Sequence, residues 1–324
     1  MRIATLTGLL WLVLSSVTGA QTTVVGYSAV TSVFLPFWIG KEAGLYKKEG
    51  LDVQLVYIPS STTMAQAMFA KEVAISTVNS GSVVSSGLQG GDLVLMGAVI
   101  NSAAFYIIAR PEITNVQELK GKRIGVTRLG SSSDFAIREY LQKNKLHPTR
   151  DVSIIQVGGM PELAAALNSG AIGAAPLSSP MSYVAEQGGN KVLANLANEG
   201  IYFVIAGLTT TRRFLREQRS DAKLFLRAFG RATHFMFQQR EESKKILRKY
   251  AKINDLGMLD GSLKYAHDFT EKIPLVKREG VQVVLDQEAI KNPKAKEFSA
   301  EQFYDNSLVQ ELVDDGFFKS LWGK

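Results

Sequence analysis

The hydrophobic and polar positions of this 324-residue chain follow two alternating periods. Short apolar runs rich in β-branched residues, such as 51–58 and 93–100, are typical of buried strands. Between such runs, apolar residues recur three and four positions apart, as in 36–48 and 132–143, which predicts amphipathic helices. Strands that alternate with helices along a chain predict a largely parallel sheet covered by helices on both faces.

The alternation occurs twice before the chain becomes helical. In the first round we predict strands at 23–27, 51–58, 73–77 and 93–100, and helices at 36–48, 62–70 and from 80 onward. In the second round we predict strands at 123–127, 152–157, 171–174 and near 192, and helices at 132–143, 161–168 and 179–186. The apolar segments 103–109 and 201–208 join the two rounds, and the chain from 210 onward has few strand signals.

This organisation predicts an α/β protein with two lobes, because 324 residues exceed what one hydrophobic core usually organises. We expect the first lobe to comprise residues 21–108 and 206–324, with a helical C-terminal tail, and the second lobe to comprise residues 109–205. Two short crossings, near Ala109 and Ile205, imply a hinge with a ligand cleft between the lobes.

The first twenty residues have the features of an export signal. Arg2 precedes an apolar run at 6–14, and small residues continue to Ala20, where we expect cleavage. The apolar run is short for a membrane span, and a retained N-terminal anchor is the alternative. The chain has no cysteine, so disulfides and a cysteine-linked lipid anchor are excluded. We therefore predict a freely soluble periplasmic protein, present as a monomer.

Composition and charge exclude other classes of protein. With 46% hydrophobic and 21% charged residues, the chain is an ordinary globular protein without the composition of disorder. The net charge of +7 is modest, and its basic residues are dispersed. The densest basic group, at 244–252, has apolar residues at helical spacing, which indicates an amphipathic helix with a solvated face. We therefore expect neither nucleic-acid nor membrane binding.

Short segments across both lobes resemble one protein family. They are PFWIGKEAGLY at 36–46, EGLDV at 49–53, AISTVNS at 74–80, LKGKRIGV at 119–126, GSS at 130–132, DV at 151–152 and AALNSGAI at 165–172. Their order and spacing resemble the nitrate, sulfonate, taurine and thiamine-precursor class of periplasmic substrate-binding proteins. The resemblance implies the two-lobed type II fold, a ligand between the lobes, and docking onto the membrane permease of an ABC importer. Gly173 departs from it, because the family often has aspartate there.

The loop at 128–134 is the first candidate for ligand contact, since ligands of open α/β sheets gather where strands end. Its backbone N–H groups, the helix dipole and the hydroxyls of Ser131, Ser132 and Ser133 are expected to converge on an anion or polar group. Ser131 with Asp134 also forms a capping box, which needs no ligand. Arg128 is a candidate partner for a carboxylate, sulfonate or phosphate, or else a solvated loop residue. Asp134 either caps its helix or faces a cationic group of the ligand.

Further candidate contacts follow other strands of the two predicted sheets. They are Ser28, Ser32, Phe34, Asn79, Ser80, Asn101, Ser178 and Tyr202. The alternative for the small polar residues is a purely local role, since such residues also end strands and cap helices. Phe37 and Trp38 are expected in the core rather than in the cleft wall, because they lie early in an amphipathic helix.

Catalytic chemistry has little support in the sequence. His147, His234 and His267 have no metal-ligand spacing, and no P-loop or nucleophile elbow occurs. We therefore predict a binding protein without catalytic residues, cofactor or metal. It would capture a small organic anion or zwitterion, similar to a sulfonate, nitrate or a heterocyclic precursor, close around it and deliver it to a permease. A receptor for a sensor kinase and an enzyme on the same fold are the alternatives.

Overall fold

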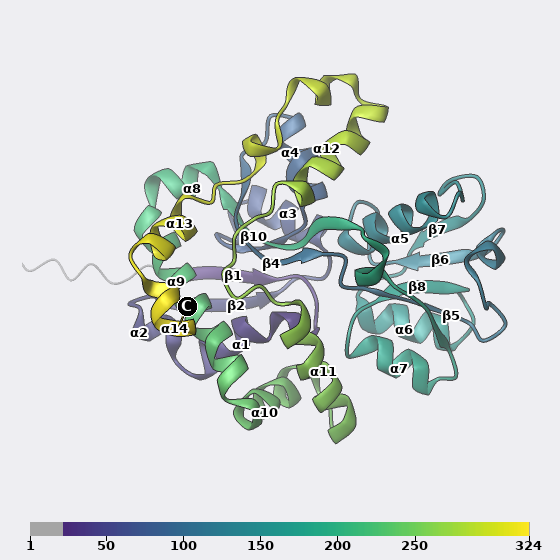
Figure 1. Ribbon diagram of the computed structural model, residues 1–324, viewed down its shortest axis with the longest axis horizontal. Coiled ribbons are helices and arrows are strands. Elements are labelled where there is room, and N and C mark those ends of the chain that lie inside the picture. Colours follow the sequence, from purple (N-terminus) through teal and green to yellow (C-terminus); the bar gives the residue numbers. More distant parts are fainter. Residues whose placement is uncertain (1–21, 324) are drawn as a thin grey trace, which may run out of the picture.

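The computed structural model describes residues 22–323, and the predicted signal segment 1–20 lies outside the described residues. The chain forms two α/β lobes side by side along the long axis of the molecule (Figure 1). We use "first lobe" for the body that contains the N-terminal strand and "second lobe" for the body built on a five-stranded sheet. No helix within residues 22–323 is long and apolar enough to cross a membrane.

The sheet of the first lobe is assembled from both ends of the chain. Strand β1 (Thr23–Tyr27) pairs in parallel with β2 (Val53–Tyr57), and Val25 bridges to Ile75 just before β3 (Ser76–Val78). Strand β10 (Tyr202–Thr211) lies between β3 and β4 (Leu93–Ser102), antiparallel to both. The strand order is therefore β2-β1-β3-β10-β4.

The sheet of the second lobe repeats this arrangement. Its strands, in spatial order, are β7 (Ser153–Gln156), β6 (Arg123–Val126), β8 (Ala174–Leu177), β5 (Tyr106–Ala109) and β9 (Lys191–Asn195). Strand β5 is antiparallel to both of its neighbours, as β10 is in the first lobe. Each sheet thus receives its one antiparallel strand from a segment that arrives from the other lobe.

Helices cover both sheets. The first lobe contains α1 (Leu35–Glu42), α2 (Leu45–Lys48), α3 (Ser61–Phe69) and α4 (Ser80–Leu88). The second contains α5 (Ser132–Lys143), α6 (Met160–Asn168) and α7 (Met181–Gln187). The single helix predicted at 36–48 is wrong, because Gly44 takes a left-handed conformation at φ +66° and separates α1 from α2.

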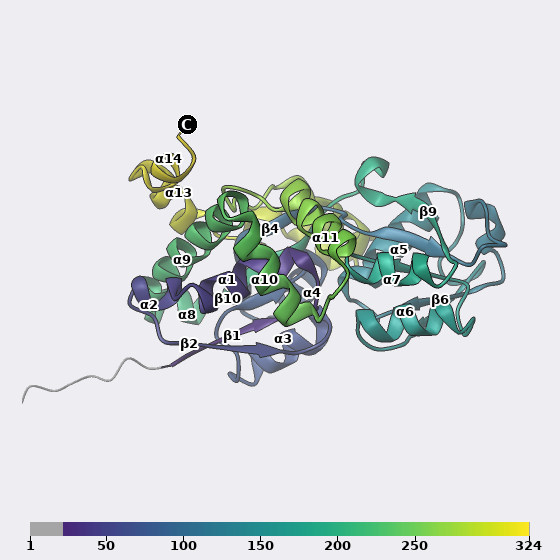
Figure 2. The same cartoon turned by 90° about the horizontal axis from the view of Figure 1, so that it is seen from below.

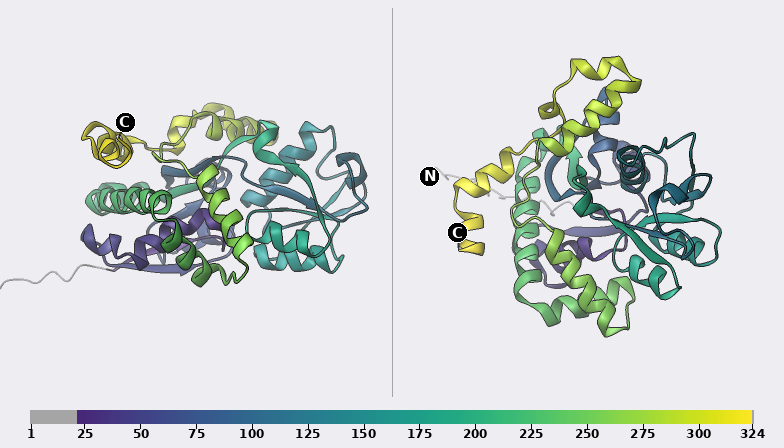
Figure 3. Two further views of the ribbon diagram at one scale, coloured as in Figure 1. Left: turned by 60° about the horizontal axis from the view of Figure 1, so that its bottom comes forward. Right: turned by 45° about the vertical axis from the view of Figure 1, so that its right-hand side comes forward.

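The C-terminal tail is helical, as predicted, and gathers around the first lobe (Figures 2 and 3). Its helices are α8 (Arg212–Glu217), α9 (Arg219–Gln238), α10 (Arg240–Ala251), α11 (Leu256–Phe269), α12 (Glu279–Lys291), α13 (Ser307–Asp314) and α14 (Phe317–Trp322). Phe37 of α1 packs against Phe225 and Phe229 of α9, and Trp38 stacks on Tyr250 of α10. Phe37 and Trp38 are fully buried core residues, as expected.

The strand pairings move several predicted boundaries. Residues 106–109 pair within the second sheet and residue 202 already pairs within the first, so we place the crossings at 103–105 and 196–201. The strand predicted at 171–174 is β8 at 174–177, because the chain is still turning at Gly170, at φ +77°. Pro176 lies within β8, opposite Ile107 of β5.

Candidate functional site

A pocket lined by residues of both lobes lies between them, and part of it is open to solvent. One part of its wall carries hydroxyl groups, from Ser28, Thr31, Ser60, Ser61, Thr127, Ser131, Ser132, Ser133 and Ser178. The other part is apolar or aromatic, from Ala29, Val33, Phe34, Ile100, Ala104, Phe105, Met160, Ile205, Ala206 and Tyr265. None of these residues has a charged side chain at neutral pH, so the pocket is uncharged and divided between polar and apolar walls.

Two helices, one from each lobe, begin at this pocket. Ser60 is the N-cap of α3 and accepts a hydrogen bond from the Thr63 N–H, and Ser131 is the N-cap of α5 and accepts one from the Asp134 N–H. The N–H groups of a first helical turn have no acceptor within the helix, and they carry the positive end of its dipole. Two such ends at one pocket can bind an anion without a charged side chain.

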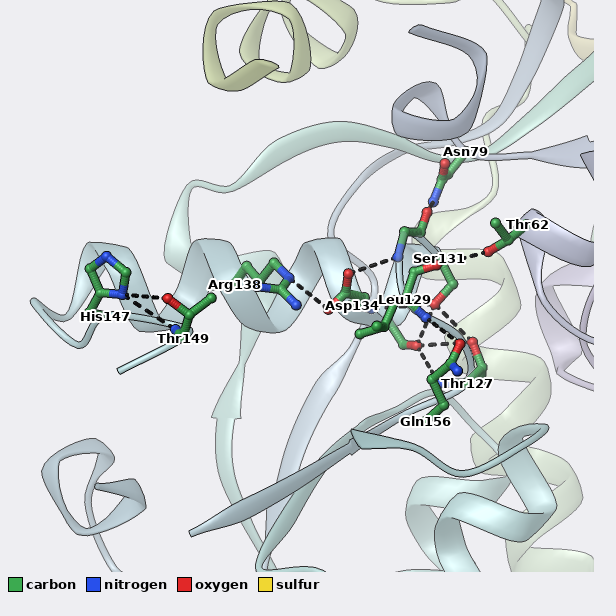
Figure 4. A network of polar contacts seen from close by, with 12 residues as sticks. Thr62, Asn79, Thr127, Leu129, Ser131, Asp134, Arg138, His147, Thr149 and Gln156 are labelled. Carbon is green, nitrogen blue, oxygen red and sulfur yellow. Dashed lines mark hydrogen bonds and ion pairs between the residues drawn. The ribbon is translucent and has the colours of Figure 1, made fainter. Parts of the chain in front are cut away.

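Three hydroxyls form a cluster at the start of α5. The Thr127 Oγ1 donates to Ser131 Oγ at 2.9 Å and lies 3.1 Å from Ser133 Oγ, and Ser131 Oγ lies 2.9 Å from Ser133 Oγ. The Thr127 N–H also donates to Ser133 Oγ, at 3.0 Å. Each hydroxyl is therefore held in place by the other two, within the network of polar contacts that Figure 4 shows.

Thr31 has a buried hydroxyl that the protein does not satisfy. The residue is 1% exposed and lines the pocket, and its Oγ1 has no hydrogen-bond partner among residues 22–323. Buried hydroxyls in folded proteins almost always have a partner, and the place of this one in the pocket wall makes Thr31 a candidate ligand contact. The adjacent Ser32, which the sequence predicted as a ligand contact, also has an unpartnered Oγ among the described residues, but it does not line the pocket.

Tyr265 of α11 brings the C-terminal tail to the pocket wall. Its hydroxyl donates to the backbone carbonyl of Ala104, in the crossing between the lobes. Burial raises its pKa well above the ordinary value, so the hydroxyl stays neutral near pH 7. Tyr265 could not be predicted from the sequence, because nothing local in α11 marks a tyrosine that bonds to a segment 161 positions away.

Half of the predicted ligand contacts lie in the pocket wall. These are Ser28, Phe34, Ser131, Ser132, Ser133 and Ser178. They come from the ends of β1, β6 and β8 and from the helical turns that follow these strands. That they contact the ligand stays a prediction.

The other predicted contacts lie outside the wall for identifiable reasons. The Ser80 hydroxyl donates to the Gly280 carbonyl, and the Asn101 amide binds Glu271 and the Leu275 carbonyl, so both attach the tail to the first lobe. The Asn79 side chain caps α4 by accepting from the Ser82 N–H at 2.6 Å. Tyr202 is 60% exposed and lies at another surface, beside α5 and α12.

The loop before α5 also differs from the prediction. Arg128 donates to its neighbouring carbonyl at Thr127 and does not line the pocket. Asp134 accepts from the Gly130 N–H at 2.8 Å and from Arg138 Nε at 2.7 Å, and it too lies outside the wall. Asp134 therefore holds its own loop and does not face the ligand. Because its carboxylate occupies the Gly130 N–H, the loop offers an anion only the groups from Ser131 onward.

The lobes touch directly around the pocket. Ser132 Oγ of the second lobe donates to the Ile205 carbonyl of the first at 2.8 Å, and lies 3.2 Å from Ser61 Oγ at the start of α3. On the other side, Ser179 accepts from the Ser32 N–H at its carbonyl and pairs with Ser262 of α11 through its hydroxyl. The structure is therefore a closed arrangement of the two lobes.

The three histidines lie away from the pocket. His147 bonds to Thr149, His234 packs against Trp322, and His267 bonds to the Met236 carbonyl. Among residues 22–323, no group of histidine and acidic side chains is arranged to hold a metal ion. The side chains that do line the pocket include no group that accepts a proton readily near pH 7.

Comparisons with known proteins identify a family model that matches this chain and solved structures that share its fold. The family model described as "NMT1/THI5 like" matches residues 31–243. The alkanesulfonate-binding protein SsuA from Xanthomonas axonopodis pv. citri, bound to MOPS, superposes with a TM-score of 0.72 at 16% identity, over 90% of this chain and 96% of that chain. The periplasmic nitrate-binding protein NrtA from Synechocystis PCC 6803 gives 0.74 at 15% identity, over 92% and 89%.

A curated relative matches at the level of sequence. The protein YtlA of Bacillus subtilis (strain 168) is 21% identical over 208 residues, which are 63% of this chain and 62% of that relative's length. The identities to the solved structures are low, so these likenesses show the fold alone. They confirm the predicted type II fold with two lobes.

Proposed function

Because the chain belongs to the NMT1/THI5 like family, we propose that it is the extracytoplasmic solute-binding component of an ABC importer. It captures a small organic anion between its lobes, closes around it and delivers it to a membrane permease, in the periplasm. Proteins of the same fold that bind an alkanesulfonate and nitrate support this assignment.

The observation that carries the proposal is the uncharged, two-sided pocket. An oxyanion fits between the N-termini of α3 and α5 and the surrounding hydroxyls, including Thr31. An apolar remainder of the ligand fits against side chains such as Phe34, Phe105 and Met160. No carboxylate lines the pocket, so an ammonium group would lose its hydration without a counter-ion. Of the two classes predicted from the sequence, the organic anion is therefore favoured over the zwitterion.

Thermal unfolding of residues 21–324 tests the ligand class. We would compare butane-1-sulfonate with taurine, which has a sulfonate and an ammonium group, and with nitrate, which has no apolar part. A ligand at about 100 times its Kd stabilises the folded state by about 2.7 kcal/mol. We expect butane-1-sulfonate to raise the unfolding midpoint most. Equal stabilisation by taurine would show that the argument from charge is wrong.

Two buried threonines supply a matched pair of variants for the site. Thr31→Val removes a hydroxyl that has no partner in the protein, so the ligand-free protein should keep its stability while the ligand-induced shift becomes smaller. Thr233→Val removes an equally buried and unpartnered hydroxyl in α9, away from the pocket. It should leave the ligand-induced shift unchanged. The site assignment fails if the two variants respond alike.

Uptake separates the importer from the two alternatives. Deleting the gene in its host should abolish accumulation of the radiolabelled ligand identified by the unfolding panel. A receptor for a sensor kinase would leave accumulation intact. An enzyme on the same fold would convert the ligand, and incubation of the purified protein with it would reveal a product.

A further inference from the structure

Two consecutive carbonyls of the second lobe accept hydrogen bonds from the first lobe (Figure 4). The Leu129 carbonyl accepts from Thr62 Oγ1 at 3.3 Å. The Gly130 carbonyl accepts from Ser82 Oγ at 3.3 Å and from Asn79 Nδ2 at 3.5 Å. All three donors lie at the N-termini of α3 and α4, so the carbonyls also face the positive ends of two helix dipoles.

The second lobe holds this loop in position from its other side. The Leu129 N–H donates to Gln156 Oε1 at 3.1 Å, and the Gly130 N–H donates to Asp134 Oδ2 at 2.8 Å. Asp134 is itself fixed by Arg138. Gly130 has φ +77°, a conformation that glycine adopts without strain. Because both N–H groups are bonded within their own lobe, the loop is organised to present its carbonyls to the first lobe.

We propose that Leu129 and Gly130 form a catch that holds the lobes closed, with Gln156 and Asp134 as its positioning residues. The inference rests on the proposed function as a protein that closes around a ligand. None of the three donors lines the ligand pocket, so the catch acts on closure and release and not on the choice of ligand. Its bonds are long and partly exposed, which keeps closure reversible.

The absence of cysteine allows two spin labels to report on closure directly. Cysteines introduced at Glu72 in the first lobe and Arg150 in the second lie at exposed positions outside the pocket. Double electron–electron resonance then gives the distribution of distances between the lobes, without ligand and with butane-1-sulfonate. In Thr62→Val/Ser82→Ala we expect the ratio of closed to open molecules to fall about tenfold in ligand-free protein, since two hydrogen bonds are lost.

A matched control lies on the same helix as Ser82. Ser85 of α4 bonds only to Gln89 of its own helix, so Ser85→Ala should keep the wild-type distance distribution. Where butane-1-sulfonate binds, the double variant should release it about tenfold faster in stopped flow, with association unchanged. If the double variant and Ser85→Ala both match the wild type in ligand-free protein, the catch is refuted. Failure of butane-1-sulfonate to bind would count only against the proposed ligand.

Gln156 tests whether the loop must be held in position. It is an exposed residue, so its replacement should leave the fold intact, which the unfolding midpoint checks. Gln156→Leu removes the acceptor for the Leu129 N–H and should shift ligand-free molecules toward the open form. Gln156→Glu keeps an acceptor oxygen and should restore the wild-type distribution. Equal behaviour of the two variants would overturn the positioning role.

Discussion

The two lobes share a strand order but not a core. Each sheet has one antiparallel strand, β10 in the first lobe and β5 in the second, inserted at the equivalent place. The first lobe buries an aromatic cluster, formed with its C-terminal tail around Phe37, Phe225 and Phe229. Within residues 106–201, the buried hydrophobic side chains are aliphatic except for Tyr140.

This difference assigns the lobes different mechanical roles. Each buried aromatic side chain removes about 150–250 Å² of surface from water, so this cluster strongly stabilises the first lobe. The second lobe has a smaller aliphatic core. It meets the first through hydroxyls and backbone groups around the pocket and through two aromatic contacts, Phe135 with Phe203 and Tyr106 with Tyr265. In the proposed closure, the smaller second lobe therefore docks onto a more stable first lobe through hydrogen bonds and aromatic contacts.

The largest expected effect comes from the aromatic core. Phe229→Ala should lower the free energy of unfolding by about 3–5 kcal/mol, because the fully buried ring contacts Phe37 and Phe225. Leu163→Ala, at a fully buried position of α6 in the second lobe, should cost about 2–3 kcal/mol. Urea unfolding measures both. An equal or larger cost at Leu163 would contradict the contrast between the lobes.

The next largest effect is expected at the ion pair that joins the C-terminal tail to the rest of the first lobe. Glu49 is 9% exposed at its side chain and accepts from Arg227 Nε at 2.8 Å and Arg231 Nε at 2.5 Å. Burial opposes its charge, but the two guanidinium groups outweigh burial and lower its pKa. Glu49→Gln should therefore cost about 2 kcal/mol near pH 7. A carboxyl whose pKa is lowered by folding stabilises the folded protein at pH values above its ordinary pKa. This stabilisation is lost as the pH falls through the lowered pKa.

Urea unfolding at two pH values checks the direction of this pH dependence. The difference in the free energy of unfolding between wild type and Glu49→Gln should be largest at pH 7 and should shrink below about pH 4. Arg219→Gln, which removes a partner of the exposed Glu311, is the comparison at the surface of the same tail and should cost about 1 kcal/mol or less. A difference at Glu49 that did not depend on pH would show that the carboxylate charge has no part in its effect.

A smaller effect is expected at the catch. Gly130→Ala should cost about 1 kcal/mol, since no atom lies near the added methyl group and only the positive φ opposes it. Gly121→Ala is its counterpart elsewhere in the second lobe, at φ +76° and equally open space. Both should lose similar stability in urea unfolding. Only Gly130→Ala should also shift the distances between the lobes, and a shift in both would point to a general loosening of the lobe.

The smallest effect is expected where α5 meets α12. Burial raises the pKa of Glu139, whose carboxylate accepts from Gln287. A raised carboxyl pKa destabilises the folded protein increasingly as pH rises above the ordinary value. Glu139→Gln should therefore stabilise by less than about 1 kcal/mol at pH 7 and have no effect near pH 4. Unfolding midpoints at the two pH values measure it, and a destabilised variant at pH 7 would contradict the sign.

The fold could be predicted well from the sequence, because strands and helices are indicated by patterns of neighbouring residues. The alternation of β-branched runs and amphipathic segments placed α5 at its observed bounds, and the serines after β6 were recognised as the start of a helix. The predictions failed where partners are distant along the chain. Ser80 and Asn101 bind the tail instead of the cleft, and Tyr265 reaches the pocket from the tail. Thr31 was missed because an unpartnered hydroxyl is visible only when its surroundings are known.

The tyrosine at position 265 has a consequence for protein engineering. The family model ends at residue 243, but part of the pocket wall comes from α11, beyond that limit. A chimaera that exchanges residues 31–243 between two relatives therefore leaves three positions of the pocket wall, 28, 29 and 265, to the other parent. Grafted ligand preference should then be incomplete until these positions are exchanged as well, so recombination points for biosensors of this family belong before residue 28 and after α11.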